Sequence, residues 1–240
     1  MNTIIRRGAA VCAAVLAAGL LDTACAFDMN KSVRVEAGSQ SGGHSTVNGS
    51  ITVGRDAEVS GDVETVNGSV TIEENARIGN AETVNGAVRI ASGVTADDVS
   101  SVDGSIRIGD NVTIDGEVSV VNGRIGIGDG SRIRDGVSNV NGEMQVAGAE
   151  IGGNLSTVNG DVLLTDGAVL QGDLIVEKPD GWNWSERRRP RVVIGPDARV
   201  VGEVRLEREV ELFISESASV GGVSGVMTMD DADRFSGPRP

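Results

Sequence analysis

The stretch Thr46-Val47-Asn48-Gly49-Ser50-Ile51-Thr52-Val53-Gly54 decides the fold, because its pattern returns along the chain every 18 or 19 residues. In it, an Asn-Gly pair precedes two apolar residues that are separated by one polar residue. Alternation with a period of two indicates a short β-strand, and Asn-Gly indicates a tight turn. The four-residue opening returns as Thr65-Val66-Asn67-Gly68, Thr83-Val84-Asn85-Gly86, Ser101-Val102-Asp103-Gly104, Val120-Val121-Asn122-Gly123, Asn139-Val140-Asn141-Gly142 and Thr157-Val158-Asn159-Gly160.

Each repeat contains further turn signals and further short apolar pairs. In the first copy, Ala57 and Val59 form one such pair, and Gly61-Asp62-Val63 follows it. A unit of this length with three strands and three corners is one coil of a parallel β-helix. A single coil cannot bury its own apolar side chains, so coils must stack and bury them against the equivalent residues above and below.

The repeat predicts an all-β fold, a right-handed parallel β-helix (β-solenoid) of about nine coils with 18–19 residues each. An incomplete coil around Val33 and Val35 precedes them. A right-handed β-helix is favoured because Val63 and Val66 are three residues apart, which breaks the six-residue period of left-handed β-helices. Nine coils at about 4.8 Å each give a rod roughly 43 Å long. Two inward columns are predicted: Ile51, Val70, Val88, Ile106, Ile125, Met144, Val162, Val192 and Leu212, and Val53, Ile72, Ile90, Ile108, Ile127, Val146, Leu164, Ile194 and Ile214.

One corner of each coil carries Asn or Asp, and these side chains would stack at the coil spacing. Stacked amides can hydrogen-bond along the stack, as Asn ladders do in cross-β structures. Asn tolerates a left-handed backbone and Gly adopts it freely, which suits a corner. We therefore expect a structural corner ladder, with a ligand-binding ladder as the alternative, made of Asn48, Asn67, Asn85, Asp103, Asn122, Asn141 and Asn159.

The repeat is interrupted once, after Val176, where residues 177–191 replace the Asn-Gly corner. Insertions in repeat proteins lie in corner loops, so 177–191 is predicted to be a corner-loop insertion near the C-terminal end of the rod. The repeat fades near residue 226. This gives a β-helix domain over 27–226 and a flexible C-terminal tail over 227–240.

The inserted loop is the candidate binding site. It holds both tryptophans of the chain and its densest basic cluster, and these residue types are enriched at binding hot spots. Loops on rigid scaffolds often carry function. The competing interpretation is that the loop folds back onto the rod and its Arg side chains pair with corner carboxylates. The candidate residues are Trp182, Trp184, Arg187, Arg188, Arg189 and Arg191.

Residues 1–26 have the pattern of a secretory signal peptide. Arg6 and Arg7 precede an apolar run over 8–21, and Ala24-Cys25-Ala26 has the small residues of a cleavage site. The run is shorter than the roughly 20 residues of a membrane-spanning helix, so no transmembrane segment is expected in the mature chain. Cys12 also lies in the removed segment, which leaves the mature protein without thiols. The chain is predicted to be periplasmic or extracellular, with a lipid anchor on Cys25 as the alternative.

Composition and charge exclude some classes of function. The 240 residues include 34 Gly, 3 Phe, 2 Trp and no Tyr, whereas enzyme cores and pockets usually draw on aromatic rings. The formal net charge of −14 argues against a nucleic-acid partner, because phosphate binding needs a basic surface.

No catalytic, cofactor-binding or metal-binding residue is predicted. The single His, His44, lies in a Ser/Gly-rich stretch and is expected to be an exposed loop residue. Acidic residues are frequent at the corners, but neither an EF-hand spacing nor a Gly-rich Ca²⁺-binding repeat occurs. They are expected to form a solvated surface that keeps the rod soluble.

The coil motifs Ile51-x-Val53-Gly54, Ala57-x-Val59 and Gly61-Asp62-Val63 resemble those of the bactofilins, or polymer-forming cytoskeletal proteins, over roughly 47–223. That resemblance implies a right-handed β-helix that polymerises end to end without nucleotide. The unit at 157–162 also resembles secreted adhesin-type β-repeat proteins of bacterial envelopes. The export signal and the loop at 177–191 depart from the bactofilin pattern, and they put a cytoskeletal role in question.

Together these features predict an exported, non-enzymatic structural or scaffold protein of the bacterial cell envelope, with self-polymerisation as one form of that role. An adhesin-like binding module that uses the 177–191 loop is the alternative. A polysaccharide-active enzyme is a remote third, because such enzymes stack sugars on aromatic side chains that this chain lacks. Expected partners are other copies of the chain or an envelope component.

Overall fold

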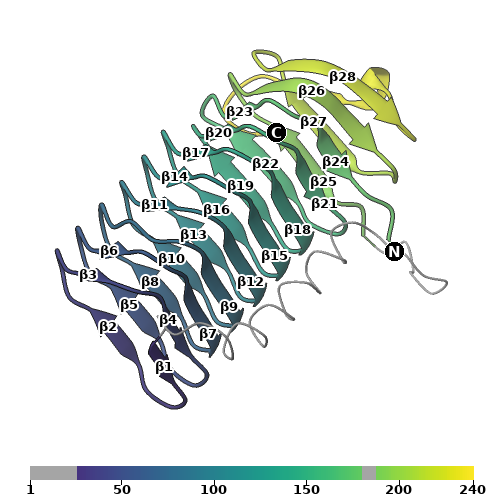
Figure 1. Cartoon of the computed structure of the whole chain (residues 1–240). Coiled ribbons are helices and arrows are strands. Elements are labelled where there is room, and N and C mark those ends of the chain that lie inside the picture. The colour runs from purple at the N-terminus through teal and green to yellow at the C-terminus, as the bar shows by residue number, and fades with distance from the viewer. Residues whose placement is uncertain (1–25, 180–187) are drawn as a thin grey trace.

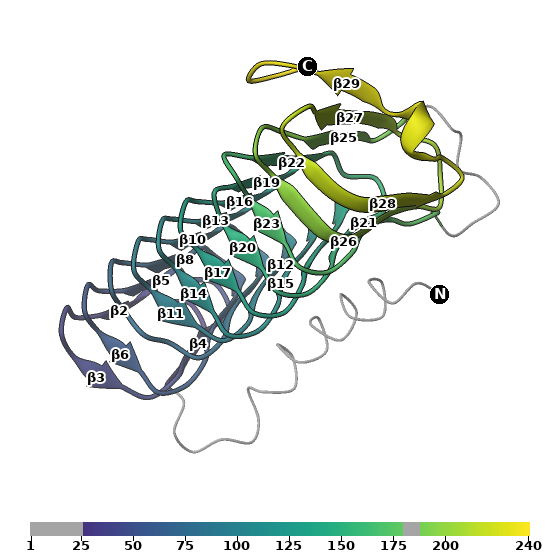
Figure 2. The same cartoon turned by 90° about the horizontal axis from the view of Figure 1, so that it is seen from above.

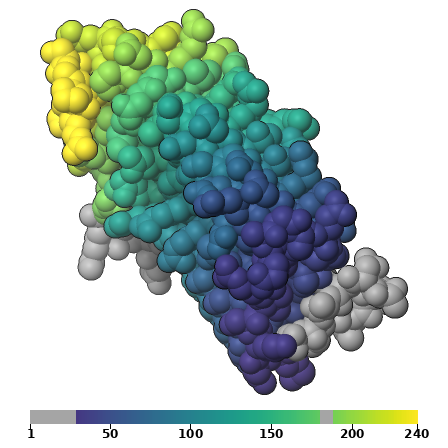
Figure 3. Space-filling view, turned by 90° about the vertical axis from the view of Figure 1, so that its left-hand side faces the viewer, coloured from purple at the N-terminus to yellow at the C-terminus, as the bar shows by residue number. Residues whose placement is uncertain are grey.

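The structure, a computed structural model, describes residues 26–179 and 188–240. Parallel strands stack into a β-solenoid of about ten turns, which confirms the predicted fold class (Figures 1 and 2). The coils follow one another in sequence order along a rod, as the space-filling view shows (Figure 3). We call the three sides of the rod face 1, face 2 and face 3, in the order in which each coil visits them.

Face 1 is a continuous parallel sheet that contains both predicted inward columns. Its strands are β2 (Val33–Val35), β5 (Ile51–Val53), β8 (Val70–Ile72), β10 (Val88–Ile90), β13 (Ile106–Ile108), β16 (Ile125–Ile127), β19 (Met144–Ala147), β22 (Val162–Thr165), β25 (Arg191–Ile194), β27 (Glu211–Ser215) and β29 (Asp233–Phe235). All residues of the two columns are buried, and none is more than 4% exposed. The inward assignment made from the sequence is therefore confirmed.

Face 2 is built from two-residue strands, and face 3 from strands of three to five residues. Face 2 holds β3 (Gln40–Ser41), β6 (Glu58–Val59), β11 (Thr95–Ala96), β14 (Thr113–Ile114), β17 (Arg132–Ile133), β20 (Glu150–Ile151) and β23 (Val169–Leu170). Face 3 holds β1 (Ala26–Asp28), β4 (His44–Thr46), β7 (Val63–Asn67), β9 (Ala81–Asn85), β12 (Val99–Asp103), β15 (Val118–Asn122), β18 (Val137–Asn141), β21 (Leu155–Thr157) and β24 (Leu174–Val176). The long strands β26 (Arg199–Leu206) and β28 (Ser219–Gly225) then run across both faces, because β26 pairs with β23 and with β24.

The first coil is complete, which corrects the prediction of nine coils after an incomplete one. The chain passes from β2 through β3 to β4, and β3 pairs in register with β6. The stretch from Gly38 to Gly43 has no apolar alternation, so the sequence gives no sign of its strand. Hydrogen bonds to the next coil form it instead, for example from Glu58 N to Ser39 O at 2.9 Å.

The left-handed backbone lies at a different corner from the one expected. Positive φ angles occur between face 1 and face 2, at positions such as Asp56, Asn75 and Asn111. Among the glycines of the Asn-Gly corners, Gly142 is the one with a positive φ, at 130°. Gly is needed at these corners for space: a Cβ on Gly68 or Gly104 would overlap the carbonyl oxygen of the corner glycine one coil before.

The C-terminal end differs from the flexible tail expected over 227–240. A short 3-10 helix, η1 (Met229–Asp231), crosses the end of the rod, and β29 pairs in parallel with β27. Met227, Met229 and Ala232 pack against the core there. Their apolar side chains cover the last coil, which would otherwise expose its core, and this explains why the chain stays on the rod.

Candidate functional site

The Asn side chains of the repeat form a ladder along the corner between face 3 and face 1. Each Nδ2 donates to the Oδ1 of the residue one coil earlier, at 2.8–3.0 Å. Most of these side chains are exposed, so the ladder lies on the surface of the rod. The bonds run from Asn48 to Asn30, Asn67 to Asn48, Asn85 to Asn67, Asn122 to Asp103, Asn141 to Asn122 and Asn159 to Asn141.

The ladder has one gap, at Asp103. Its carboxylate accepts a hydrogen bond from Asn122 Nδ2 at 2.8 Å but has no amide proton to donate to Asn85. Within the described residues, Asp103 and Asn85 are therefore joined by their backbones alone. The gap divides the ladder into two segments of three or more side chains.

An arginine that the sequence analysis missed ends the ladder. Arg208 Nη1 donates to Asn159 Oδ1 at 2.9 Å and to Val158 O at 3.2 Å, and Nη2 donates to Arg188 O at 3.0 Å. Arg208 follows β26 at the position where another Asn-Gly corner would stand. The sequence shows only the loss of the Asn-Gly pair there, so this contact could not have been found from the repeat.

A second row of polar side chains lies inside the same corner, and the sequence analysis missed it too. The first residue of each four-residue motif points inward and is buried. In four of the motifs its hydroxyl or amide donates to the carbonyl of the corner glycine one coil earlier: Thr65 to Gly49 at 2.8 Å, Thr83 to Gly68 at 2.9 Å, Ser101 to Gly86 at 3.2 Å and Asn139 to Gly123 at 2.9 Å. Val120 has no such donor, and Thr157 Oγ1 accepts from Gly160 N at 2.8 Å. Buried carbonyls need such partners. The signal in the sequence is the preference for Thr or Ser directly before Val-Asn-Gly.

The acidic residues of the Gly-Asp corners also connect coils. Asp62 Oδ1 accepts the backbone N–H of Asn80 at 2.9 Å, Asn80 Oδ1 accepts that of Asp98 at 3.0 Å, and Asp98 Oδ1 accepts that of Glu117 at 2.7 Å. These side chains therefore do more than solvate the surface. In the described residues, no group of three or more His, Cys, Asp or Glu side chains is placed to hold a metal ion.

The arginines of the inserted loop that the structure describes are tied to the rod. Arg188 forms an ion pair with Asp161, Arg189 forms one with Glu209, and the Arg191 guanidinium lies 4.7 Å from the centre of the Phe213 ring. The contacts of Arg188 and Arg189 match the competing interpretation, in which these side chains pair with carboxylates, whereas Arg191 stacks on an aromatic ring instead. Trp182, Trp184 and Arg187 lie outside the described residues.

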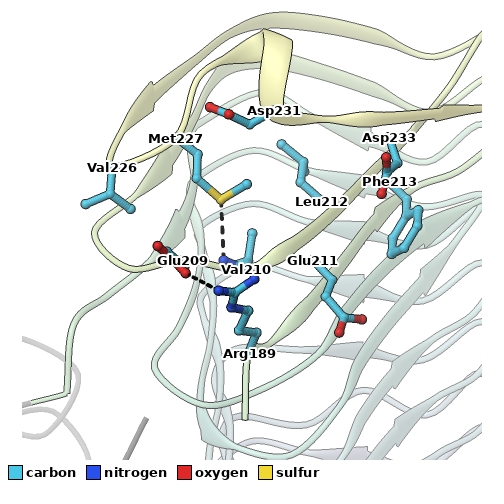
Figure 4. A pocket seen from close by; sticks show the side chains of 10 residues that line it. All are labelled: Arg189, Glu209, Val210, Glu211, Leu212, Phe213, Val226, Met227, Asp231 and Asp233. Atoms are coloured by element: carbon cyan, nitrogen blue, oxygen red, sulfur yellow. Dashed lines mark hydrogen bonds and ion pairs between the residues drawn. The ribbon is translucent and has the colours of Figure 1, made fainter. Parts of the chain in front are cut away.

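A cavity of about 690 Å³ lies beside these arginines, between the start of β27 and the residues that follow β28 (Figure 4). Val210, Leu212 and Met227 form its apolar floor. Carboxylates surround the floor, and two of them already have partners: Glu209 pairs with Arg189, and Asp231 accepts from Thr228 N at 2.8 Å. Glu211 and Asp233 also line the cavity.

His44 occupies strand β4, which corrects its expected place in a loop. It is in register with the inward residue Val63, so it takes a core position in the first coil. Its Nε2 lies 3.0 Å from Ser41 Oγ, and its buried Nδ1 has no hydrogen-bond partner. Burial lowers the pKa of His44. The imidazole lies at the end of the column that continues with Val63, and its one side-chain partner among the described residues is the Ser41 hydroxyl.

Two carboxylates stack on face 3 at adjacent coils. Glu64 and Glu82 are in register, and no Lys or Arg of the described residues forms an ion pair with either. Burial raises the pKa of Glu64, and the nearby Asp62 adds to this effect. Burial, followed by the charges of Glu64, Asp62 and Asp98, raises the pKa of Glu82 to about 7.

Comparison with known proteins adds little to this geometry. No known family matches the chain, and no curated protein does. Among solved structures, the chain is similar to a TibA fragment hyper-glycosylated by TibC, with 12% identity over 89% of this chain and 100% of that one, at a TM-score of 0.31. A similarity this low supports no argument about fold or function. No helix in the described part of the chain is long and apolar enough to cross a membrane.

Proposed function

We propose that the chain is an exported, non-enzymatic scaffold protein of the bacterial cell envelope that associates with itself through the ends of its rod. The observation that carries this proposal is the edge of β28. This seven-residue strand pairs with β26 on one side, and no described residue pairs with its other side.

The sequence of β28 suits such a role. Ser219-Val-Gly-Gly-Val-Ser-Gly225 contains no charged residue and no Pro, whereas exposed strand edges in soluble proteins usually carry charge or Pro that prevents pairing. At the other end of the rod, β2 and β3 are also terminal in their sheets. A second copy can therefore add strands to either end, which gives a polymer or a closed pair.

The proposal is tested with charges placed on the edge. Ser219→Lys combined with Ser224→Lys should reduce the apparent mass in sedimentation and remove any filaments seen by electron microscopy, because charged side chains oppose edge pairing. Thr113→Lys, on the outside of face 2 in the middle of the rod, is the matched control. A wild-type chain that stays monomeric at high concentration would contradict self-association.

A second candidate function is an adhesin-like binding module at the C-terminal end. The cavity beside Arg189, with its apolar floor and charged rim, favours it. Replacing residues 180–187 with a Gly/Ser linker should leave the circular dichroism unchanged, because Arg188–Asp161 and Arg189–Glu209 remain. It should weaken binding to isolated envelope at low salt. Equal binding of both chains at two salt concentrations would exclude this role for the loop.

A further inference from the structure

Two arginines lie next to each other on face 1 without a carboxylate partner. Arg89 of β10 and Arg107 of β13 are in register on adjacent coils, and both side chains are exposed. Their strands lie side by side in the middle of the rod (Figure 1). Among the described residues, neither arginine takes part in an ion pair or a side-chain hydrogen bond. Like charges on neighbouring strands, about 4.8 Å apart, destabilise a sheet.

The pair differs from the arginines that precede and follow it along the rod, because those have partners. Towards the N-terminal end, Arg34 forms an ion pair with Glu73 at 3.4 Å, and the other carboxylate oxygen of Glu73 accepts from Arg55 N at 3.2 Å. Towards the C-terminal end, Arg124 pairs with Glu143 at 3.8 Å. The carboxylates that border the pair are therefore used by other groups. The formal net charge is −14, so solubility does not require two further cations here.

The surface beside the pair is open. Gly126 of β16 is in register with Arg107, and a Cβ at Gly126 would have no atom within 4 Å of it. The next residue in register is Gln145 of β19, whose side chain is exposed. We call these four residues the anion row: Arg89, Arg107, Gly126 and Gln145. The row consists of two guanidinium groups, a gap above the β16 backbone and an amide, and it spans three coil steps, or about 14 Å.

We propose that the anion row binds an acidic polysaccharide. An acidic group of the sugar chain, placed between Arg89 and Arg107, accepts N–H hydrogen bonds from both guanidinium groups. Its negative charge removes the repulsion between them. The adjoining sugar ring lies in the gap at Gly126, where no side chain blocks it. The amide of Gln145 donates to and accepts from sugar hydroxyl groups at the end of the row.

The charge of the rest of the rod favours a narrow ligand. A membrane surface or a nucleic-acid duplex carries negative charge over a wide area, so it would also approach the acidic residues that give the chain its net charge of −14. A single polysaccharide chain can contact the anion row alone. This inference rests on the proposed place of the chain in the cell envelope, but it does not require association through the rod ends.

Binding to soluble polymers tests the anion row. The purified chain should bind polygalacturonate or dextran sulfate and should not bind uncharged dextran. Arg89→Gln/Arg107→Gln should weaken this binding by about ten-fold or more, because hydrogen bonds to charged groups are lost. Arg132→Gln/Arg134→Gln on face 2 is the matched control, since it makes the same change in net charge at arginines that are paired with carboxylates. Equal weakening in both variants, no binding to either acidic polymer, or binding to phosphatidylglycerol vesicles alone would overturn the proposal.

Filling the gap supplies the second measurement. Gly126→Glu places a carboxylate in register with Arg107, so it should keep or raise the melting temperature and weaken polymer binding by about ten-fold or more. Gly126→Ala leaves most of the gap open and should bind like the wild type. Unchanged binding by Gly126→Glu would overturn the proposal. The loss caused by Arg89→Gln/Arg107→Gln should be the same in the Ser219→Lys/Ser224→Lys chain, which separates failure of this proposal from failure of the proposed end association.

Discussion

Asp103 shows at the scale of one residue what the Asn ladder contributes to stability. The Asp103→Asn change supplies an amide that can donate to Asn85 Oδ1, while the new side chain still accepts from Asn122. We expect it to stabilise the fold by about 0.5–1 kcal/mol, the net value of one hydrogen bond. The urea midpoint checks this, and Asn122→Ala should shift the midpoint in the opposite direction. An unchanged or lower midpoint for Asp103→Asn would show that the missing hydrogen bond at Asp103 does not reduce stability.

Ile108 tests the core at the same scale. It points inward from β13 and is 4% exposed, whereas its neighbour Arg107 points outward. Ile108→Asp should cost several kcal/mol, because an unpaired carboxylate would lie among stacked aliphatic side chains. Arg107→Asp is the control and should change thermal melting little. Similar melting of the two variants would refute the inward assignment.

Glu82 gives the fold a pH dependence. Its pKa is raised to about 7, by burial first and then by Glu64, Asp62 and Asp98, so the folded state binds the proton more tightly than the unfolded state does. The stabilisation from Glu82 is therefore complete below pH 4.5 and is lost as the pH rises towards 7. We expect Glu82→Gln to raise the melting temperature at about pH 8 and to have little effect at about pH 4. An equal gain at both pH values would point to packing rather than charge.

The sequence predicts single residues well where they repeat and poorly where they do not. Both inward columns follow from alternation, because any apolar residue in register is buried by the coils on either side. The inward position of His44 could not be predicted in this way, because the Ser/Gly-rich stretch around it has no apolar alternation. Arg208 could not be predicted either, because Val158 and Asn159, its partners at the ladder, lie about fifty residues away along the chain.

At the scale of the element, the corner glycines are the least replaceable part of a coil. Gly104→Ala would drive a Cβ into the Gly86 carbonyl, and the stacked backbone cannot move away from it. We expect a loss of about 1–3 kcal/mol, as for other overpacked sites. Gly126→Ala is the control, because no atom lies within 4 Å of its added Cβ. Chemical denaturation compares the two, and equal stability would show that the corner can relax.

Elements that lack the repeat were predicted less well than the coils. The first coil is formed by hydrogen bonds to its neighbour, η1 is held by the apolar contacts of Met229, and β29 is held by pairing with β27. Neither kind of contact leaves a periodic pattern in the sequence. The inward row of Thr and Ser is periodic, but its direction depends on how the chain bends at the corner, which spacing alone does not give.

At the scale of the whole molecule, the rod differs at its two ends and along its faces. The C-terminal end is partly covered by η1 and β29, while β28 keeps an uncharged free edge among the described residues. Face 1 carries outward Arg34, Arg89 and Arg107, whereas the residues in register at the start of face 3 include Glu64 and Glu82. A rod with such distinct surfaces can connect to other molecules in more than one direction, as a scaffold requires.

Each stacked coil holds a much longer stretch of chain than it adds to the length of the rod. One coil raises the rod by about 4.8 Å but contains roughly 60 Å of chain when it is pulled straight. If the rod were pulled from its two ends, it would therefore unfold one coil at a time. Each unfolded coil would lengthen the chain and lower the force on its two attachment points. Single-molecule pulling from the two ends should show repeated extensions of roughly 60 Å, and rupture of the entire rod in one event would contradict this mechanical behaviour.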